Sequence, residues 1–183
     1  MTVRHALLAI LDQGSCYGYQ LRAEYARRTG AAVNVGQIYT TLERLERDGL
    51  VANRGADDRG HVYWGITDPG RGHVSEWLGR PDPPSGRDEL AHKVALAATL
   101  PGVDAAAVIS RQRSDAIDRL AGIESASSVD VAGAIVRAAA AAQARAEIEW
   151  LDAAAVAVAV DPGAAAFPLS VERPRRGRPR ESE

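Results

Sequence analysis

The most informative stretch for the fold is residues 36–51, GQIYTTLERLERDGLV. Ile38, Leu42 and Leu45 fall at i, i+4 and i+7, which places them on one side of a helix that turns by about 100° per residue. The opposite side is polar or charged. A helix often ends on a glycine in the left-handed conformation, so Asp48-Gly49 predicts the stop. The pattern therefore predicts a short amphipathic helix, and Leu50-Val51 opens a strand directly after it.

The flanking segments predict a helix-turn-helix with a β-hairpin. Two helices, over residues 3–11 and about 17–29, precede the amphipathic helix and are joined to it by short connections. Two strands, over 50–54 and 61–67, follow it, and a polar loop bounded by glycines joins them. A last helix starts at Thr67-Asp68-Pro69, a capping residue followed by a proline, and ends near Gly79. Three helices and a hairpin in this order are typical of a winged helix-turn-helix.

Three further patterns concern the inner face of the second strand, the cap of the amphipathic helix and the single cysteine. Val62, Trp64 and Ile66 alternate along the second strand and predict its inner face. Asn34 can cap the amphipathic helix by accepting a backbone N–H bond. Cys16, in the predicted loop between the first two helices, is the single cysteine, so an intramolecular disulfide and a multi-cysteine zinc site are excluded.

Three blocks carry a resemblance to a known family. HALLAILDQG followed by YGYQL, then GQIYTTLERLERDGLV, then HVYWGITDPGRG are similar to the PadR-like transcriptional regulators over residues 3–79. The resemblance implies a mainly α-helical protein with a small β-wing, in which a winged helix-turn-helix precedes a helical dimerisation module. It implies a regulator, a repressor, that binds a pseudo-palindromic operator as a homodimer. The chain departs from the family at Thr40, where proline is frequent, and at Tyr63-Trp64-Gly65 in the second wing strand.

The polar face of the amphipathic helix and the wing supply the predicted DNA contacts. Arginine can bond guanine in two places, glutamine or asparagine can bond adenine, and threonine serves either a base or a phosphate. The resemblance implies that the Tyr39 hydroxyl contacts the sugar-phosphate backbone. The predicted contact set is Asn34, Gly36, Gln37, Tyr39, Thr40, Arg44, Arg47, Arg54 and Arg59. The alternative for Arg44 and Arg47 is a solvated helix face paired with Glu43 or Asp48.

The predicted domains are a winged helix over residues 1–80, a proline-rich linker over 81–86, a helical dimerisation or effector domain over 87–160, and a disordered basic tail over 161–183. The helices of the third part are expected over 87–100, 104–124 and 129–158. The apolar stripe predicted for the long last helix consists of Val131, Ile135, Ala138, Ala142, Ile148 and Leu151. That stripe has too little partner surface within one chain, which predicts a two-fold homodimer. An intramolecular three-helix bundle is the alternative.

Two further sites are predicted. A small apolar or phenolic effector is implied by the resemblance, and Trp77 and Trp150 are candidates for lining its pocket, with core packing as the alternative for each. The tail contains an AT-hook-like motif, Arg176, Gly177, Arg178 and Pro179. Arginine in such a thin segment suits the narrow minor groove of A/T-rich DNA. A merely solvated basic tail is the alternative.

Other function classes find little support. The four histidines are not paired at metal-ligand spacing, and no nucleophile elbow, P-loop or dinucleotide motif occurs, so neither an enzyme nor a metal or cofactor is expected. The longest apolar run, 153–160, is far shorter than the roughly 20 residues of a membrane span. A cytoplasmic protein is expected. A winged helix that binds protein and not DNA is the alternative function.

Overall fold

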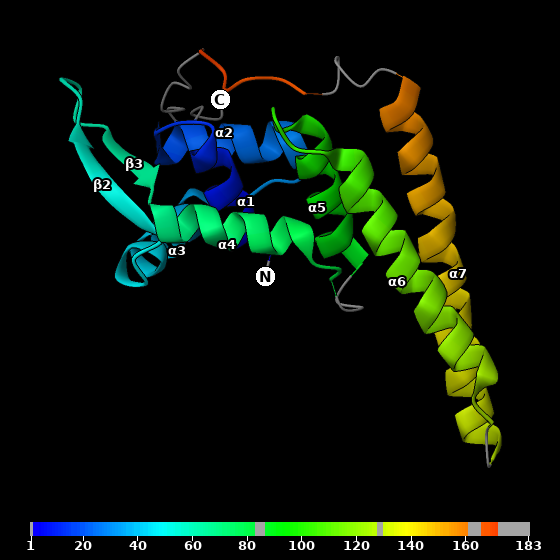
Figure 1. Ribbon diagram of the computed structural model, residues 1–183. Helices are drawn as coiled ribbons and strands as arrows, with labels where there is room; N and C mark the ends of the chain where they lie inside the picture. Colours follow the sequence, from blue (N-terminus) through cyan, green and yellow to red (C-terminus); the bar gives the residue numbers. More distant parts are fainter. Residues whose placement is uncertain (1, 83–86, 128–129, 161–165, 172–183) are drawn as a thin grey trace, which may run out of the picture. The chain divides into compact units, whose positions relative to one another are not determined.

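The structure is a computed structural model that describes residues 2–82, 87–127, 130–160 and 166–171. Its elements are α1 (Thr2–Asp12), β1 (Cys16–Tyr17), α2 (Gly18–Thr29), α3 (Val35–Arg47), β2 (Val51–Ala56), β3 (Val62–Ile66), α4 (Asp68–Gly79), α5 (Arg87–Thr99), α6 (Ala105–Ser125) and α7 (Val131–Val160). They form two compact units (Figure 1). Of the described residues, unit 1 holds those up to 77, 99–101 and 167–171, and unit 2 holds those within 78–98 and 102–166.

Unit 1 is a three-helix core with a small sheet. Ile38, Leu42 and Leu45 of α3 are fully buried, as their spacing predicts, and they join buried side chains of α1 and α2. Asn34 Oδ1 accepts the Gly36 N–H at 2.8 Å, which confirms the predicted cap. Gly30 and Gly49 have φ of 70° and 73°, so both predicted helix stops use the left-handed conformation that glycine adopts readily.

The sheet has three strands, one more than the sequence predicts. Its order is β1-β3-β2, all antiparallel, with Cys16 opposite Trp64 and Tyr17 opposite Tyr63. The prediction of a loop at Cys16 is therefore wrong, because these residues pair with a strand more than forty residues away. A two-residue strand has no periodicity of its own from which to predict it. Trp64 and Ile66 are buried, but Val62, predicted to face inward with them, is exposed.

The wing hairpin contains a bulge. The pairing of β2 with β3 is regular from Val51 to Asn53 and resumes at Ala56, so β2 has an extra residue between them. Gly55, inside the bulge, has φ of 92°. Its N–H bonds the Asn53 side chain at 2.8 Å. A bulge sharpens the local twist of a strand and so redirects its end. The direction of the wing tip therefore depends on this bulge, which the alternation of apolar and polar residues in the sequence does not reveal.

Unit 2 is built from α5, α6 and α7. Leu90 and Val94 of α5, Ile109 of α6 and Leu151 of α7 form one buried cluster. The helices α6 and α7 lie along each other, and three ion pairs join them: Arg113 with Asp152, Arg119 with Glu147, and Arg145 with Glu124 (Figure 1). The three helices predicted for this region are all present, with ends that differ by one or two residues.

The predicted apolar stripe of α7 is only partly buried. Leu151 is fully buried and Ile148 half-buried, but Val131, Ile135, Ala138 and Ala142 are exposed. In its N-terminal half α7 instead turns Ala141 and Ala144 toward α6. Small side chains let two helix backbones come close, so a face of alanines is selected here over the larger aliphatic residues. Exposure at four of the six positions agrees with the prediction that the stripe has too little partner surface within one chain.

A buried polar network lies in unit 2. Lys93, the only lysine of the chain, is 1% exposed, and its Nζ donates to the Arg80 carbonyl oxygen at 2.6 Å and pairs with Asp82 at 3.4 Å. Gln112 bonds both the N–H and the carbonyl oxygen of Asp82. Burial lowers the pKa of Lys93, although Asp82 opposes the shift. The start of the predicted linker is therefore held by side chains, while residues 83–86 lie outside the described part.

Candidate nucleic-acid interface

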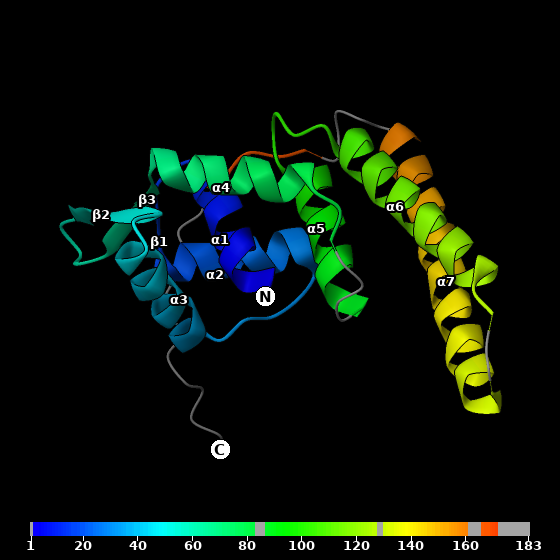
Figure 2. The ribbon, with the colours of Figure 1, turned by 60° about the horizontal axis from the view of Figure 1, so that its bottom comes forward.

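The helix α3 presents one polar face. With its apolar side buried, Gln37, Thr40, Glu43, Arg44 and Arg47 are all exposed. Asn34 and Gly36 are exposed at its first turn, where backbone N–H groups lack partners within the helix. Figure 2 shows α3 beside the β2 strand within unit 1. The predicted contact residues between 34 and 47 therefore all lie on α3 or at its N-cap.

The two arginines of this face are available to a ligand. Arg44 makes no ion pair with any residue that the structure describes. Arg47 is 75% exposed, and its Nε lies 3.7 Å from Asp48 Oδ1, a loose contact. Asp48 is bonded more closely by Arg4, at 2.8 Å, and this bond lowers the pKa of the Asp48 carboxyl. The alternative was that acidic neighbours, Glu43 or Asp48, neutralise these arginines. The structure gives Arg44 no such partner among the described residues and gives Arg47 only the loose contact with Asp48.

Tyr39 is held against the start of α2. A Cβ placed on Gly18, the first residue of α2, would lie 2.6 Å from Tyr39 Cζ and 2.7 Å from its hydroxyl oxygen. Real Cβ atoms do not approach so closely, so only glycine lets the phenol ring lie here. Tyr39 is 38% exposed. Gly18 is absent from the predicted contact set, although the Tyr-Gly-Tyr sequence at 17–19 marks the position.

The wing turn is organised by Asp57. Its Oδ1 accepts the N–H of Arg59 at 3.0 Å and of His61 at 2.9 Å, and its Oδ2 lies 3.1 Å from His61 Nδ1. The bond from the His61 backbone is the main reason that the pKa of Asp57 falls from 3.8 to about 2. The Arg59 side chain is exposed at this turn. A fixed turn with an exposed arginine can contact a phosphate or a minor groove.

Arg54 has a different position from the other predicted contacts. It lies in the β2 bulge and crosses β3 at Gly65, where an added Cβ would be 2.7 Å from Arg54 Nε. Its Nη2 donates to the Ile66 carbonyl oxygen at 3.3 Å. The missing side chain at Gly65 therefore leaves room for Arg54.

The two tryptophans predicted for an effector pocket lie in different units. Trp77, in unit 1, stacks on His5 with ring centroids 5.0 Å apart, and His5 in turn stacks on His73. Trp150, in unit 2, is half-buried and packs against the cluster around Leu151. Both positions agree with the alternative of packing, and a role for either in effector binding stays a prediction.

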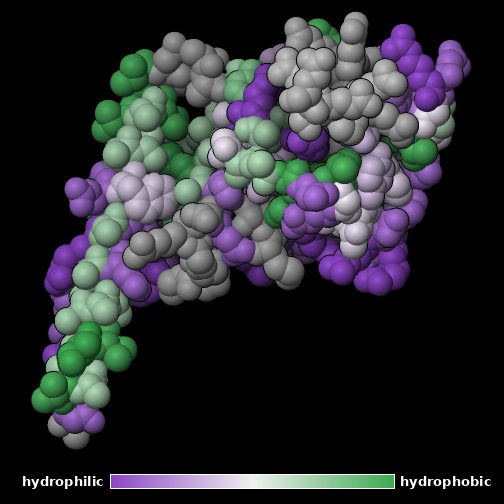
Figure 3. Space-filling view, turned by 180° about the vertical axis from the view of Figure 1, so that it is seen from behind, coloured by the Kyte–Doolittle hydropathy of each residue, from purple (hydrophilic) through white to green (hydrophobic). Residues whose placement is uncertain are grey.

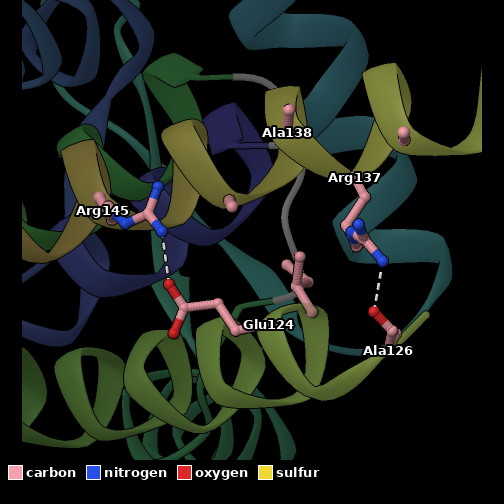
Figure 4. Close-up of a pocket in the computed structure, with 8 residues that line it drawn as sticks. Glu124, Ala126, Arg137, Ala138 and Arg145 are labelled. Carbon is pink, nitrogen blue, oxygen red and sulfur yellow. Dashed lines mark hydrogen bonds and ion pairs between the residues drawn. The ribbon is translucent and has the colours of Figure 1, made fainter. Parts of the chain in front are cut away.

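A hollow of about 370 Å³ lies at the end of the α6–α7 hairpin in unit 2 (Figure 4). Arg137 donates to the Ala126 carbonyl oxygen and Arg145 pairs with Glu124, so the two cations that face the hollow already have partners. The remaining lining is Ile123, Ala134, Ala138 and Ala141. Neither predicted tryptophan contributes to it.

The part of the chain that the structure describes contains neither a metal-ion site nor a membrane-spanning helix. Within those residues, no three His, Cys, Asp or Glu side chains are arranged to hold a metal ion. No helix in the same part of the chain has the length and apolar character to span a membrane. The AT-hook-like residues Arg176, Gly177, Arg178 and Pro179 lie outside the described residues.

Comparisons with known proteins find one family. Residues 7–76 match the model of the "Transcriptional regulator PadR-like family". No curated protein matches the sequence. Among solved structures, Bacillus subtilis PadR in complex with operator DNA is similar at 22% identity and a TM-score of 0.42, over 86% of this chain and 99% of that one. The same protein in complex with p-coumaric acid gives 21% and 0.40, over 87% and 99%. H. salinarum RosR gives 27% and 0.40, over 43% of this chain and 70% of that one.

Proposed function

We propose that this chain, whose winged helix over residues 7–76 belongs to the PadR-like family of transcriptional regulators, binds double-stranded operator DNA through α3 and its wing. The observation that carries the proposal is the polar face of α3. Its arginines have no firm acidic partner among the described residues, while the reverse face of the same helix is fully buried. Because its apolar face is packed in the core, this helix can present its polar face to the major groove and stay in position.

Each contact has a chemical role. Arg44 and Arg47 suit the two acceptors of guanine, Gln37 suits adenine, and Thr40 suits a base or a phosphate. Gly36 lets a phosphate approach the exposed N–H groups at the start of α3. Tyr39, Arg54 and Arg59 would contact the sugar-phosphate backbone or the adjacent minor groove, contacts that position the protein but do not select a sequence.

We further propose a homodimer that acts as a repressor. The support for the homodimer is the exposed apolar row of α7, with Val131 at 76%, Ile135 at 64% and Val156 at 65% exposure. The repressor role is what the family resemblance implies. In Figure 3 hydrophobic surface gathers at the tip of the α6–α7 hairpin. Two winged helices related by two-fold symmetry read a pseudo-palindrome, with half-sites about 34–36 Å or a multiple apart.

Release by a small apolar or phenolic effector is part of the same proposal and derives from the family resemblance. Calorimetric titration of the full chain with phenolic acids, in the presence and absence of operator DNA, tests it. We expect heat of binding and a weaker protein–DNA complex. No heat with any compound of this class, together with unchanged DNA affinity, would exclude this class of effector.

DNA binding itself is tested by a gel shift on the DNA upstream of the gene for this chain, at a stated salt concentration. We expect Arg44→Ala to weaken binding by roughly 1–3 kcal/mol and to relax the sequence preference at one base pair. Arg111→Ala, an exposed arginine on α6, is the matched control and should bind as the wild type. If the wild type binds this DNA no better than unrelated DNA, the alternative of a protein-interaction module is favoured.

A further inference from the structure

Asp48 places a negative charge at the end of α3, next to the proposed DNA contact Arg47. It is the C-cap residue, and its N–H donates to the Arg44 carbonyl oxygen at 3.0 Å. The carbonyl groups in the last turn give that end of a helix a partial negative charge, so a carboxylate there is unfavourable unless a cation compensates it. Asp48 therefore needs a cationic partner, and the choice of partner decides which cation is left for DNA.

Two arginines reach this carboxylate, and they hold it unequally. Arg4 Nη1, from the first turn of α1, donates to Asp48 Oδ2 at 2.8 Å. Arg47 Nε lies 3.7 Å from Asp48 Oδ1, which is too far for a hydrogen bond. The bond from Arg4 is also the main reason that the pKa of Asp48 is lowered, and Arg47 contributes less. Asp48 is therefore compensated chiefly from α1 and not by its neighbour in α3.

The packing of α1 explains why Arg4 is the stronger partner. The side chains from Ala6 to Leu11 that follow Arg4 are all buried, so the core fixes the helix on which Arg4 lies. The Arg4 side chain is 28% exposed and that of Arg47 is 75% exposed. An ion pair costs side-chain entropy when it immobilises a long exposed side chain. Pairing Asp48 with Arg4 therefore costs less than pairing it with Arg47.

The choice of partner matters for DNA binding. A side chain that is already paired within the protein must break that pair before it binds a ligand, and this cost reduces the affinity. If Arg4 were absent, Arg47 would be the arginine that remains beside the Asp48 carboxylate. Its guanidinium would then be drawn to the end of α3 and would be less available to a base.

We propose that Arg4 is a positioning residue for DNA binding, which holds Asp48 from α1 and so leaves the guanidinium of Arg47 free to bind a base. Arg4 contacts no DNA in this arrangement and changes the affinity only through Asp48 and Arg47. This inference rests on the proposed DNA-binding function.

The experiment is a pair of double-mutant cycles. The proteins are the wild type, Arg4→Ala, Asp48→Asn, Arg47→Ala, and the two double variants that combine Arg4→Ala with each of the others. Their affinity for the DNA upstream of the gene for this chain is measured by fluorescence anisotropy at one stated salt concentration. Asparagine keeps the size of Asp48 and removes only its charge. Arg71→Ala is the matched control, because it breaks a different ion pair of α1, with Asp12 at 3.2 Å.

We expect Arg4→Ala to weaken binding about threefold, the scale of an exposed ion pair, and by no more than Arg47→Ala does. Arg4→Ala should have no further effect once Asp48→Asn has removed the carboxylate, or once Arg47 is absent. Arg4→Lys keeps a cation at this position and should retain most of the affinity. Arg71→Ala should bind as the wild type.

Three results would overturn the proposal. Unchanged affinity of Arg4→Ala would remove the role of Arg4. An equal loss with and without the Asp48 charge would show that Arg4 contacts DNA directly. A loss that persists in Arg47→Ala would show that the carboxylate repels DNA without involving Arg47. If urea unfolding shows that alanine at position 4 destabilises unit 1, Arg4→Gln, which keeps the aliphatic stem, takes its place in both cycles.

A readout without DNA separates this inference from the proposed function. In an NMR titration the Asp48 carboxyl should have a pKa below its ordinary value of 3.8. Arg47→Ala should change this pKa little while Arg4 is present and should raise it toward 3.8 once Arg4 is absent, because only then is Arg47 the main partner.

An equal rise of the Asp48 pKa in both backgrounds would refute the preference for Arg4, whether or not the protein binds DNA. The expected pattern in a wild type that binds no DNA would refute the proposed function, and with it the effect on binding, but would keep the pairing of Arg4 with Asp48.

Discussion

Among single residues, Gly18 and Gly70 should respond differently to substitution by alanine, because different atoms lie beside them. Beside Gly18 lies the far end of a tyrosine, which can swing aside. Beside Gly70, in the first turn of α4, lies the Leu50 carbonyl oxygen at 2.2 Å from an added Cβ, together with Ile66. A backbone group in a strand-adjacent turn cannot move without disturbing the sheet. The first substitution should therefore affect binding and the second folding.

Gly18→Ala should displace Tyr39 and weaken DNA binding while lowering stability by only about 0.5–1.5 kcal/mol, the usual cost of an unfavourable rotamer. The measurement is DNA affinity of Gly18→Ala, Tyr39→Ala and the double variant, with urea unfolding of each. Because Tyr39 carries the effect, the double variant should bind no more weakly than Tyr39→Ala. A further loss in the double variant would show that Gly18 acts by another route.

Gly70→Ala should destabilise unit 1 by about 1–3 kcal/mol, since overpacking forces backbone shifts. Gly72→Ala, two residues on in the same helix with no atom within 4 Å of the added Cβ, is the matched control. It should raise stability by roughly 0.5–1 kcal/mol, because alanine is the better helix former. Urea unfolding curves of the two variants give both values, and equal effects would contradict the packing seen at Leu50.

Among the helices and strands, the wing turn depends on one carboxylate. The pKa of Asp57 is lowered to about 2, chiefly by the His61 backbone N–H, so the folded turn favours the charged form. Its stabilisation is complete above the ordinary pKa of 3.8 and is lost as the pH falls through about 2. Protonation removes an acceptor from the amides of Arg59 and His61.

The amides of Arg59 and His61 should therefore stay ordered as the pH is lowered to about 3 and change near pH 2, where Asp57 titrates. Their chemical shifts in an NMR titration measure this. In Asp57→Ala the same amides should be disordered at every pH, and DNA binding should weaken because Arg59 is no longer held. A transition near the ordinary pKa of 3.8 in the wild type would mean that the carboxylate is not bonded as described.

In the molecule as a whole, one face of α7 remains without a partner among the described residues. Val131, Ile135, Val156 and Val160 are all more than 60% exposed and share that face at 3.6 residues per turn. Val136 is equally exposed but lies about 100° away around the helix. A row of large aliphatic side chains along a helix is a typical surface for a second helix, whereas a lone valine is not.

Ile135→Glu should therefore convert a dimer to a monomer, while Val136→Glu should leave the dimer intact. Analytical ultracentrifugation at several concentrations measures the change, and DNA affinity should fall with dissociation because each monomer reaches one half-site. Equal behaviour of the two variants would place the interface elsewhere. A wild type that sediments as a monomer would favour the alternative of an intramolecular bundle.

Elements whose signals are local can be predicted from the order of the residues alone. The spacing of Ile38, Leu42 and Leu45 predicts both faces of α3, because burial of one side of a regular helix fixes the exposure of the other. Asn34, Gly30 and Gly49 predict helix ends, since a cap acts within one turn. The exposed contact set of α3 follows from these signals.

Features that depend on distant partners become visible only in the folded chain. Cys16 and Tyr17 form a strand because Trp64 and Tyr63 lie opposite. Gly18 is needed because Tyr39 reaches it. Phe167 is held on α2 because Arg28 bonds its carbonyl oxygen and that of Thr99. In α7, the small residues Ala141 and Ala144 pack against α6, whereas Ile135 remains exposed. Local periodicity reports which residues share a face, but the choice between competing faces is made by packing between elements.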